Sequence, residues 1–260
     1  MKLAFMSSVF PKLDLAGLIA KAEEYGYAGI EFRPEWDHAH GLEPGADAGT
    51  LKAAREAMAA AGLEPCCISP GVKFCSPDEK ERDAQFEKLL GYIDLAAGAG
   101  IPRIRIFGDP IPNGGRGSRA ESYRVQAGHL ARAAEKAEEA SVLLCIETHS
   151  NFRAFDTGEV LFHAGYPPAL MVNWHLGHCL RHGEGVDEAY RHVKGRVAHV
   201  HFSLKEEEAG DEQIERQIEL LKPEAYDGFF SVEVINPDDG DAVAAAHAEK
   251  WAAIKKRLGI

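Results

Sequence analysis

Two kinds of segment alternate along the whole chain. Polar, alanine-rich stretches place apolar residues every three or four positions, which predicts helices that bury one face. Between them lie short runs that are apolar almost throughout, as expected for parallel strands covered on both faces. Glycine follows several helical stretches, as at Gly26, Gly62 and Gly100, and a glycine in the left-handed conformation is a common helix stop. The pattern therefore predicts a series of β-α units.

Eight strands and eight helices are predicted. The strands cover residues 3–7, 28–32, 65–69, 103–107, 142–147, 169–174, 197–202 and 229–234. The helices cover residues 14–25, 50–61, 79–99, 119–140, 157–164, 185–193, 211–221 and 240–258. Strict alternation in one chain of 260 residues favours an α/β fold of the (β/α)8 TIM-barrel type over an open sheet. No G-x-G-x-x-G follows the first strand, which argues against a dinucleotide-binding sheet. No linker divides the chain, so we expect one domain over residues 1–260.

Composition narrows the classes of partner. The formal net charge of −12 argues against nucleic acid, whose phosphates need clustered Lys and Arg. No apolar run is long enough to span a bilayer. The five cysteines show no C-x-x-C spacing, so reduced thiols and a cytoplasmic location are expected. We expect a small-molecule partner, no membrane partner, and leave a homo-oligomer open.

Four residues that suit a metal ion fall at the ends of consecutive predicted strands. In a TIM barrel the active site is built where the strands end at their carboxyl side. The four are Glu147, His175, His201 and Glu233. Any one of them alone could be a polar side chain that simply makes hydrogen bonds to its neighbours. The four together are expected to converge on one side of the barrel axis. Two buried glutamates repel each other unless a cation compensates them, so a divalent metal site is predicted.

Other polar residues near the strand ends are candidates for substrate binding. They are Glu31, Lys73, Arg105, His149 and His178. His178 is expected in a loop. His149 could equally make a hydrogen bond to a metal ligand instead of contacting substrate. His199 and His201 share one face of the seventh strand, and His201 is favoured as the ligand because it is nearer the mouth. The remaining candidates are expected to be solvated: His38, His40, His163, His182, His192 and His247.

Several stretches resemble the xylose isomerase-like TIM-barrel superfamily of sugar isomerases, epimerases and abasic-site endonucleases. They are I-E-T-H-S-N at 146–151, H-V-H-F at 199–202 and F-S-V-E-V at 230–234, supported by 74–82 and 93–108. The resemblance covers nearly the whole chain and implies that Glu147, His201 and Glu233 bind the metal. It further implies a metal-dependent isomerase or epimerase of a small sugar, keto-sugar or sugar acid. In that chemistry Glu147 and Glu233 move a proton next to a carbonyl.

The chain departs from the superfamily pattern on two strands. The sixth usually carries Asp-x-x-His, with the aspartate on the metal, and here reads His175-Leu-Gly-His178. The seventh usually continues with Lys-Asp, where this chain has Ser203-Leu204. With two glutamates and two histidines around a divalent ion, the formal charge is zero instead of −1. Imidazole ligands then shift the expected preference toward Mn, Zn, Co, Fe or Ni and away from Mg.

Three other functions are weighed against the isomerase or epimerase. A dehydratase or decarboxylase, both lyases, would use the same proton abstraction on a related polyhydroxylated substrate. The endonucleases of the superfamily need further histidines on the third and fourth strands, and this chain has none there. A non-catalytic metal- or sugar-binding barrel would explain the altered positions, but a buried glutamate pair is costly to keep without a purpose.

Overall fold

The computed structural model describes residues 1–112, 116–204 and 209–260, and within them eight parallel strands close into a barrel in chain order. The first strand pairs with both the second and the last. The strands are β1 (Lys2–Met6), β2 (Gly29–Phe32), β3 (Glu64–Ile68), β4 (Arg103–Phe107), β5 (Leu143–Glu147), β6 (Leu170–Asn173), β7 (Val197–Phe202) and β8 (Phe229–Val232). The predicted (β/α)8 TIM barrel is confirmed.

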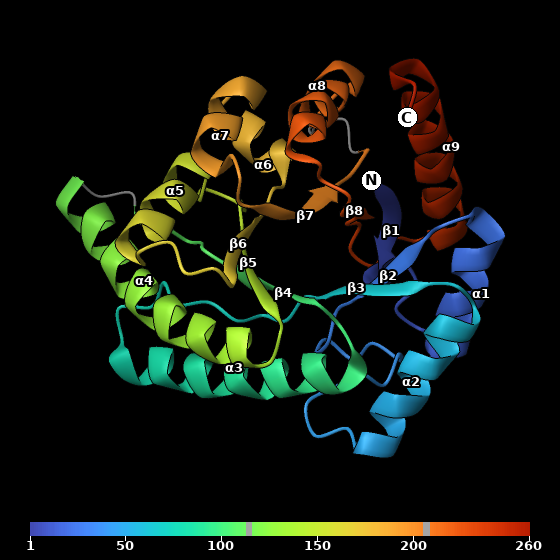
Figure 1. Ribbon diagram of the computed structural model, residues 1–260, viewed down its shortest axis with the longest axis horizontal. Coiled ribbons are helices and arrows are strands. Elements are labelled where there is room, and N and C mark those ends of the chain that lie inside the picture. The colour runs from blue at the N-terminus through green and yellow to red at the C-terminus, as the bar shows by residue number, and fades with distance from the viewer. Residues whose placement is uncertain (113–115, 205–208) are drawn as a thin grey trace.

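The helices surround the strands (Figure 1). They are α1 (Leu15–Tyr25), α2 (Ala48–Ala60), α3 (Glu79–Ala99), α4 (Arg116–Glu139), α5 (Ala154–His163), α6 (Leu176–Arg181), α7 (Val186–Val193), α8 (Asp211–Leu221) and α9 (Gly240–Leu258), with short 3-10 turns η1 (Ser7–Val9) and η2 (Lys222–Glu224). Predicted boundaries lie within three residues of these. One helix was missed: α6 contains His178, so its assignment to a loop is wrong.

Capping residues explain where the helices start and stop. The Asp14 carboxylate accepts a hydrogen bond from the backbone N–H of Gly17 at the start of α1, which satisfies a donor that lacks a partner inside the helix. Gly26 and Gly100 end α1 and α3 in the left-handed conformation, with φ of 71° and 70°, as predicted. Ser141, just after α4, adopts the same conformation with φ of 58°, although the side chain makes it less favourable than glycine.

The barrel interior contains buried polar side chains, whereas the layer between the barrel and the helices is apolar. Ile30, Ile146 and Val200 belong to the outer apolar core. Glu31 of β2 and His199 of β7 are fully buried and contact each other, and these strands are not neighbours in the barrel. Both side chains must therefore point into the barrel. Side chains alternate along a strand, which accounts for apolar residues outside and polar residues inside.

Three histidines expected to be solvated are buried. The ring of His40 lies between the carbonyl of Arg33 and the backbone N–H of Leu42, at 3.0 and 3.1 Å, so it folds the loop after β2. His247 of α9 accepts a hydrogen bond from the backbone N–H of Leu204. His38 is 7% exposed. The prediction for these three is wrong because each lies where a loop folds back over the barrel or a helix packs on it.

The described part of the chain has two further properties that bear on the predictions. All five cysteines are free thiols, as expected from their spacing. No helix in the described ranges combines the length and the apolar character that crossing a membrane requires.

Candidate functional site

The four predicted metal ligands come from four consecutive β-α units. Glu147 is the last residue of β5, and His201 lies near the end of β7. Glu233 directly follows β8, and His175 follows β6 by two residues, where it precedes the first turn of α6. The structure brings these four side chains together as a group that could hold a metal ion.

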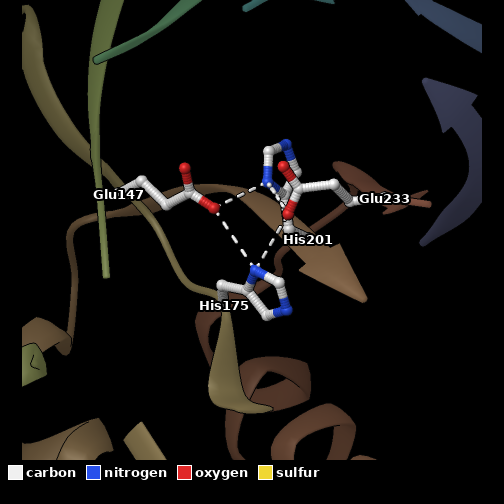
Figure 2. A group of neighbouring side chains, drawn as sticks. All are labelled: Glu147, His175, His201 and Glu233. Atoms are coloured by element: carbon white, nitrogen blue, oxygen red, sulfur yellow. Dashed lines mark hydrogen bonds and ion pairs between the residues drawn. The ribbon is translucent and has the colours of Figure 1, made fainter. Parts of the chain in front are cut away.

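Four side-chain atoms of this group form a closed ring in which carboxylate oxygens and imidazole nitrogens alternate. Oε1 of Glu147 lies 3.3 Å from Nδ1 of His175 and 2.9 Å from Nδ1 of His201. Oε2 of Glu233 lies 3.1 and 3.2 Å from the same two nitrogens. Figure 2 shows the two glutamates reaching in from opposite sides, with the two histidines between them. We call these four residues the Glu147–Glu233 centre.

The size of this ring fits a divalent transition-metal ion. With all four edges near 3 Å, a point between the atoms lies about 2.0–2.2 Å from each, which matches the usual distances from Zn²⁺ to imidazole nitrogen and carboxylate oxygen. The donor set, two carboxylates and two imidazoles, is also one that such ions bind. The Glu233 side chain is 10% exposed, whereas the side chains of Glu147 and His201 are fully buried. The centre is thus more open on the Glu233 side.

The carboxylates of the Glu147–Glu233 centre and its surroundings favour a positive charge between them. Burial by itself lowers the pKa of His201, but the surrounding carboxylates of Glu31, Glu233 and Glu147 outweigh this and raise it well above its usual value. Burial and the Glu233 charge both raise the pKa of Glu147, yet His201, Arg105 and His175 together hold it below its usual range. Negative charge is therefore concentrated here and is compensated by protonated imidazole or by a bound cation.

Glu31 lies beneath the centre, inside the barrel, and not at the mouth. Its Oε1 lies 2.8 Å from Nε2 of His201, and its Oε2 lies 2.8 Å from Nε2 of His199. The hydroxyl group of Ser69 also donates to Oε1. Both carboxylate oxygens already have partners and the residue is fully buried, so Glu31 does not lie where the sequence places it, among the substrate-binding residues of the mouth.

Two further predicted residues, His178 and His149, extend the row of imidazole rings that begins at His175. The His178 ring centroid lies 4.3 Å from that of His175 and 4.5 Å from that of His149. Burial, followed by the charge of His175, lowers the pKa of His178 to about 2, so its ring is neutral. Nδ1 of His149 lies 2.7 Å from Oδ1 of Asp109. Sequence reasoning did not single out Asp109, which follows β4 and orients this imidazole.

The two cationic residues predicted to bind substrate, Arg105 and Lys73, lie in different surroundings. Arg105 is fully buried, its guanidinium group 3.6 Å from the Phe107 ring centroid and its Nε 3.5 Å from Oε2 of Glu147. Among the described residues, neither Nε nor Nη1 of Arg105 makes a hydrogen bond. Lys73 is exposed and its backbone bridges to Phe107 at the rim of the barrel. Arg105 therefore lies next to the Glu147–Glu233 centre, as a neighbour of Glu147, whereas Lys73 lies at the rim of the barrel.

A sequence model of the family described as "Xylose isomerase-like TIM barrel" matches residues 19–255. The chain belongs to this family. No curated protein sequence matches it significantly. The match covers β2 to β8 and nearly all of α9, and so includes all four residues of the Glu147–Glu233 centre.

Several solved structures share this xylose isomerase-like barrel. An L-ribulose 3-epimerase is 19% identical, with a TM-score of 0.78, and the alignment covers 99% of this chain and 97% of that one. A 3-keto-D-glucoside 4-epimerase from E. coli is 14% identical, with a TM-score of 0.77 and coverage of 98% and 99%. A probable 3-DHS dehydratase from Bacillus anthracis is 18% identical, with a TM-score of 0.76 and coverage of 97% and 99%. At these identities the likeness establishes the fold alone.

Within this xylose isomerase-like barrel, the network beneath the centre is what sequence reasoning missed. The H-x-H spacing of His199 and His201 placed both on one face of β7, but nothing in the sequence paired them with Glu31 on the far side of the barrel. The pairs β2–β3 and β6–β7 also shift register, between Ile30 and Glu31 and between Val172 and Asn173. Such bulges re-aim side chains near active sites, and periodicity does not reveal them.

Proposed function

We propose that this chain is a divalent-metal-dependent sugar isomerase or epimerase that transfers a proton next to a carbonyl of a small sugar, keto-sugar or sugar acid. The observation that carries this proposal is the ring of alternating oxygens and nitrogens in the Glu147–Glu233 centre. Membership of the family and the epimerase neighbours support it. Two buried carboxylates held this close repel each other unless a cation compensates them, and metal-assisted proton transfer would use both.

Glu147, His175, His201 and Glu233 would hold the ion. When bound, the ion would polarise a substrate carbonyl or hydroxyl pair as a Lewis acid. Two imidazoles and two carboxylates favour Mn, Zn, Co, Fe or Ni over Mg, which prefers oxygen ligands and its own waters.

The two glutamates are suited to move the proton. They enter the centre from opposite sides (Figure 2), so one takes the α-proton from one face of the substrate while the other returns a proton to the opposite face. This inverts the stereocentre, as in epimerisation. Return of the proton to the neighbouring carbon gives isomerisation instead. Each carboxylate directs one oxygen into the ring and keeps a second oxygen outside it, and that of Glu147, Oε2, lies 3.5 Å from Nε of Arg105.

His178 and His149 would contact the hydroxyl groups of the substrate. The His178 ring lies next to His175 and the His149 ring lies next to His178, and the neutral His178 both donates and accepts hydrogen bonds. Arg105 would act on the substrate indirectly, by compensating the charge of Glu147 at 3.5 Å.

A lyase is the second candidate, and the dehydratase among the structural neighbours favours it. Removal of the same α-proton followed by loss of a neighbouring hydroxide would give a dehydrated product. The two reactions are distinguished by their products, because epimerisation conserves mass and dehydration loses one water.

Deuterium exchange tests the proposed function. Protein loaded with Mn²⁺ or Zn²⁺ is incubated in D₂O with a panel of ketoses, keto-sugars and sugar acids, and the products are examined by NMR and mass spectrometry. We expect deuterium at the carbon next to the carbonyl of at least one substrate, with the signal lost after chelation and in Glu147→Gln. Glu184→Gln is the matched control, since Glu184 is equally buried but binds the start of α5. Exchange that persists in Glu147→Gln contradicts the mechanism.

A further inference from the structure

We infer that Glu31 is a positioning residue that fixes which ring nitrogen of His201 faces the Glu147–Glu233 centre, an assignment that rests on the metal site proposed above. The observation is the placement of His201 between carboxylates on both sides of its ring. Nδ1 faces Glu147 and Glu233 at 2.9 and 3.2 Å, and Nε2 faces Glu31 at 2.8 Å. In Figure 2 the two ring nitrogens of His201 point in different directions, one into the centre and one away from it.

A neutral imidazole carries one proton, and its location decides which nitrogen binds a metal. With the proton on Nε2, His201 donates a hydrogen bond to Glu31, and the lone pair of Nδ1 is free for the ion. With the proton on Nδ1, an unprotonated Nε2 would lie 2.8 Å from a carboxylate oxygen of Glu31, and the lone pairs of the two atoms would repel each other. Glu31 therefore selects the form of His201 that binds metal in the centre, and it also orients the ring.

Glu31 is itself held rigidly for this task. Its two oxygens accept hydrogen bonds from His201, from His199 and from the hydroxyl group of Ser69. These partners come from β7 and the end of β3, on two different sides of the barrel. A carboxylate with three donors and no exposure has one available position, so the position of the His201 ring is fixed as well.

The same region contains a second group with the spacing of a metal site, Glu31, Cys67 and His199. Its contacts favour the positioning role instead. Both oxygens of Glu31 are already hydrogen-bonded to the two histidines. Burial, and then the charge of Glu31, raise the pKa of the Cys67 thiol well above its usual value, so sulfur stays protonated and is a poor ligand.

Two buried variants separate positioning from general damage to the core. Glu31→Gln keeps the shape, but its single amide oxygen accepts from only one of the two histidines, and its NH₂ group faces the other. His199→Gln disturbs the same carboxylate and removes the ring that packs against His201 at 5.4 Å, but it leaves the hydrogen bond between Glu31 and His201 in place. Binding of Zn²⁺ and of Mn²⁺ to metal-free protein is measured by calorimetric titration. We expect Glu31→Gln to weaken binding about 10- to 100-fold, the range found when outer partners of metal ligands are removed, and His199→Gln to weaken it much less.

A spectroscopic measurement on the wild-type chain gives an independent readout. In ¹⁵N-histidine-labelled protein loaded with Zn²⁺, long-range ¹H–¹⁵N correlations report which nitrogen of His201 carries the proton. We expect the proton on Nε2 and the metal on Nδ1. The opposite assignment overturns the inference, as does equal metal affinity of wild type and Glu31→Gln. Equal weakening in Glu31→Gln and His199→Gln also overturns it, because the effect then reflects core damage. Wild-type chain that binds neither ion overturns the proposed metal site as well.

Discussion

Replacing Arg105 by methionine removes a buried positive charge next to Glu147 while keeping most of the side-chain volume. At the 3.5 Å between Nε of Arg105 and Oε2 of Glu147, an effective dielectric constant of about 20 gives an attraction of about 5 kcal/mol. Removing one partner of a buried ion pair costs about 3–5 kcal/mol. We therefore expect Arg105→Met to destabilise the metal-free protein by about 3–5 kcal/mol, which corresponds to roughly 6–20 °C in Tm for a chain of this size.

A bound divalent ion reduces this loss. The ion supplies a second positive partner for Glu147, so the destabilisation of Arg105→Met should fall to about half at saturating Mn²⁺. Thermal unfolding followed by far-UV circular dichroism, once with EDTA and once with Mn²⁺, measures both values. Arg103→Met is the matched control, because Arg103 lies on the same strand and no ion pair joins it to another described residue; its guanidinium group donates a hydrogen bond to the carbonyl of Cys66, at 3.4 Å.

Two results would refute this reasoning. If Arg105→Met and Arg103→Met lose the same stability, the cost lies in β4 packing and not in the charge of Glu147. If the loss for Arg105→Met is the same with and without metal, no cation takes over the role of the guanidinium group at the centre.

Two further predictions concern the metal preference and the stability of the fold. His175→Asp adds a carboxylate to the centre, so the ratio of Mg²⁺ to Zn²⁺ affinity, measured by calorimetric titration, should rise by about tenfold or more; an unchanged ratio argues that His175 is not a ligand. Glu184→Ala removes the carboxylate that accepts the backbone N–H groups of Ala154 and Phe155 at 2.8 and 2.9 Å. Urea unfolding should show a loss of about 3 kcal/mol, and about half of that in Glu184→Gln, which keeps one acceptor; equal losses would exclude this cause.

Periodicity and composition were enough to predict the barrel and the order of its strands, because both depend on which faces are apolar. They also predicted that Glu147, His175, His201 and Glu233 come together, since the carboxyl ends of consecutive strands lie next to each other in a closed parallel barrel. The sequence can predict a residue's place in the site in this way when that place depends only on the residue's position along its strand.

Contacts across the barrel were not predictable in the same way. Glu31 was expected at the mouth because it lies near the end of β2, but its side chain meets His199 and His201 from the opposite wall. His40 was expected in solvent because it follows a strand, yet the loop folds its ring inward onto Arg33. Such contacts join residues that are far apart in the sequence, so neither hydrophobic periodicity nor a short motif predicts them.

The most direct test of the metal site is anomalous X-ray diffraction from crystals grown with Mn²⁺ or Zn²⁺. The proposed function predicts one strong anomalous peak, about 2.0–2.4 Å from Oε1 of Glu147, Nδ1 of His175, Nδ1 of His201 and Oε2 of Glu233. A peak elsewhere, as between Glu31 and Cys67, or no peak inside the barrel, would contradict it.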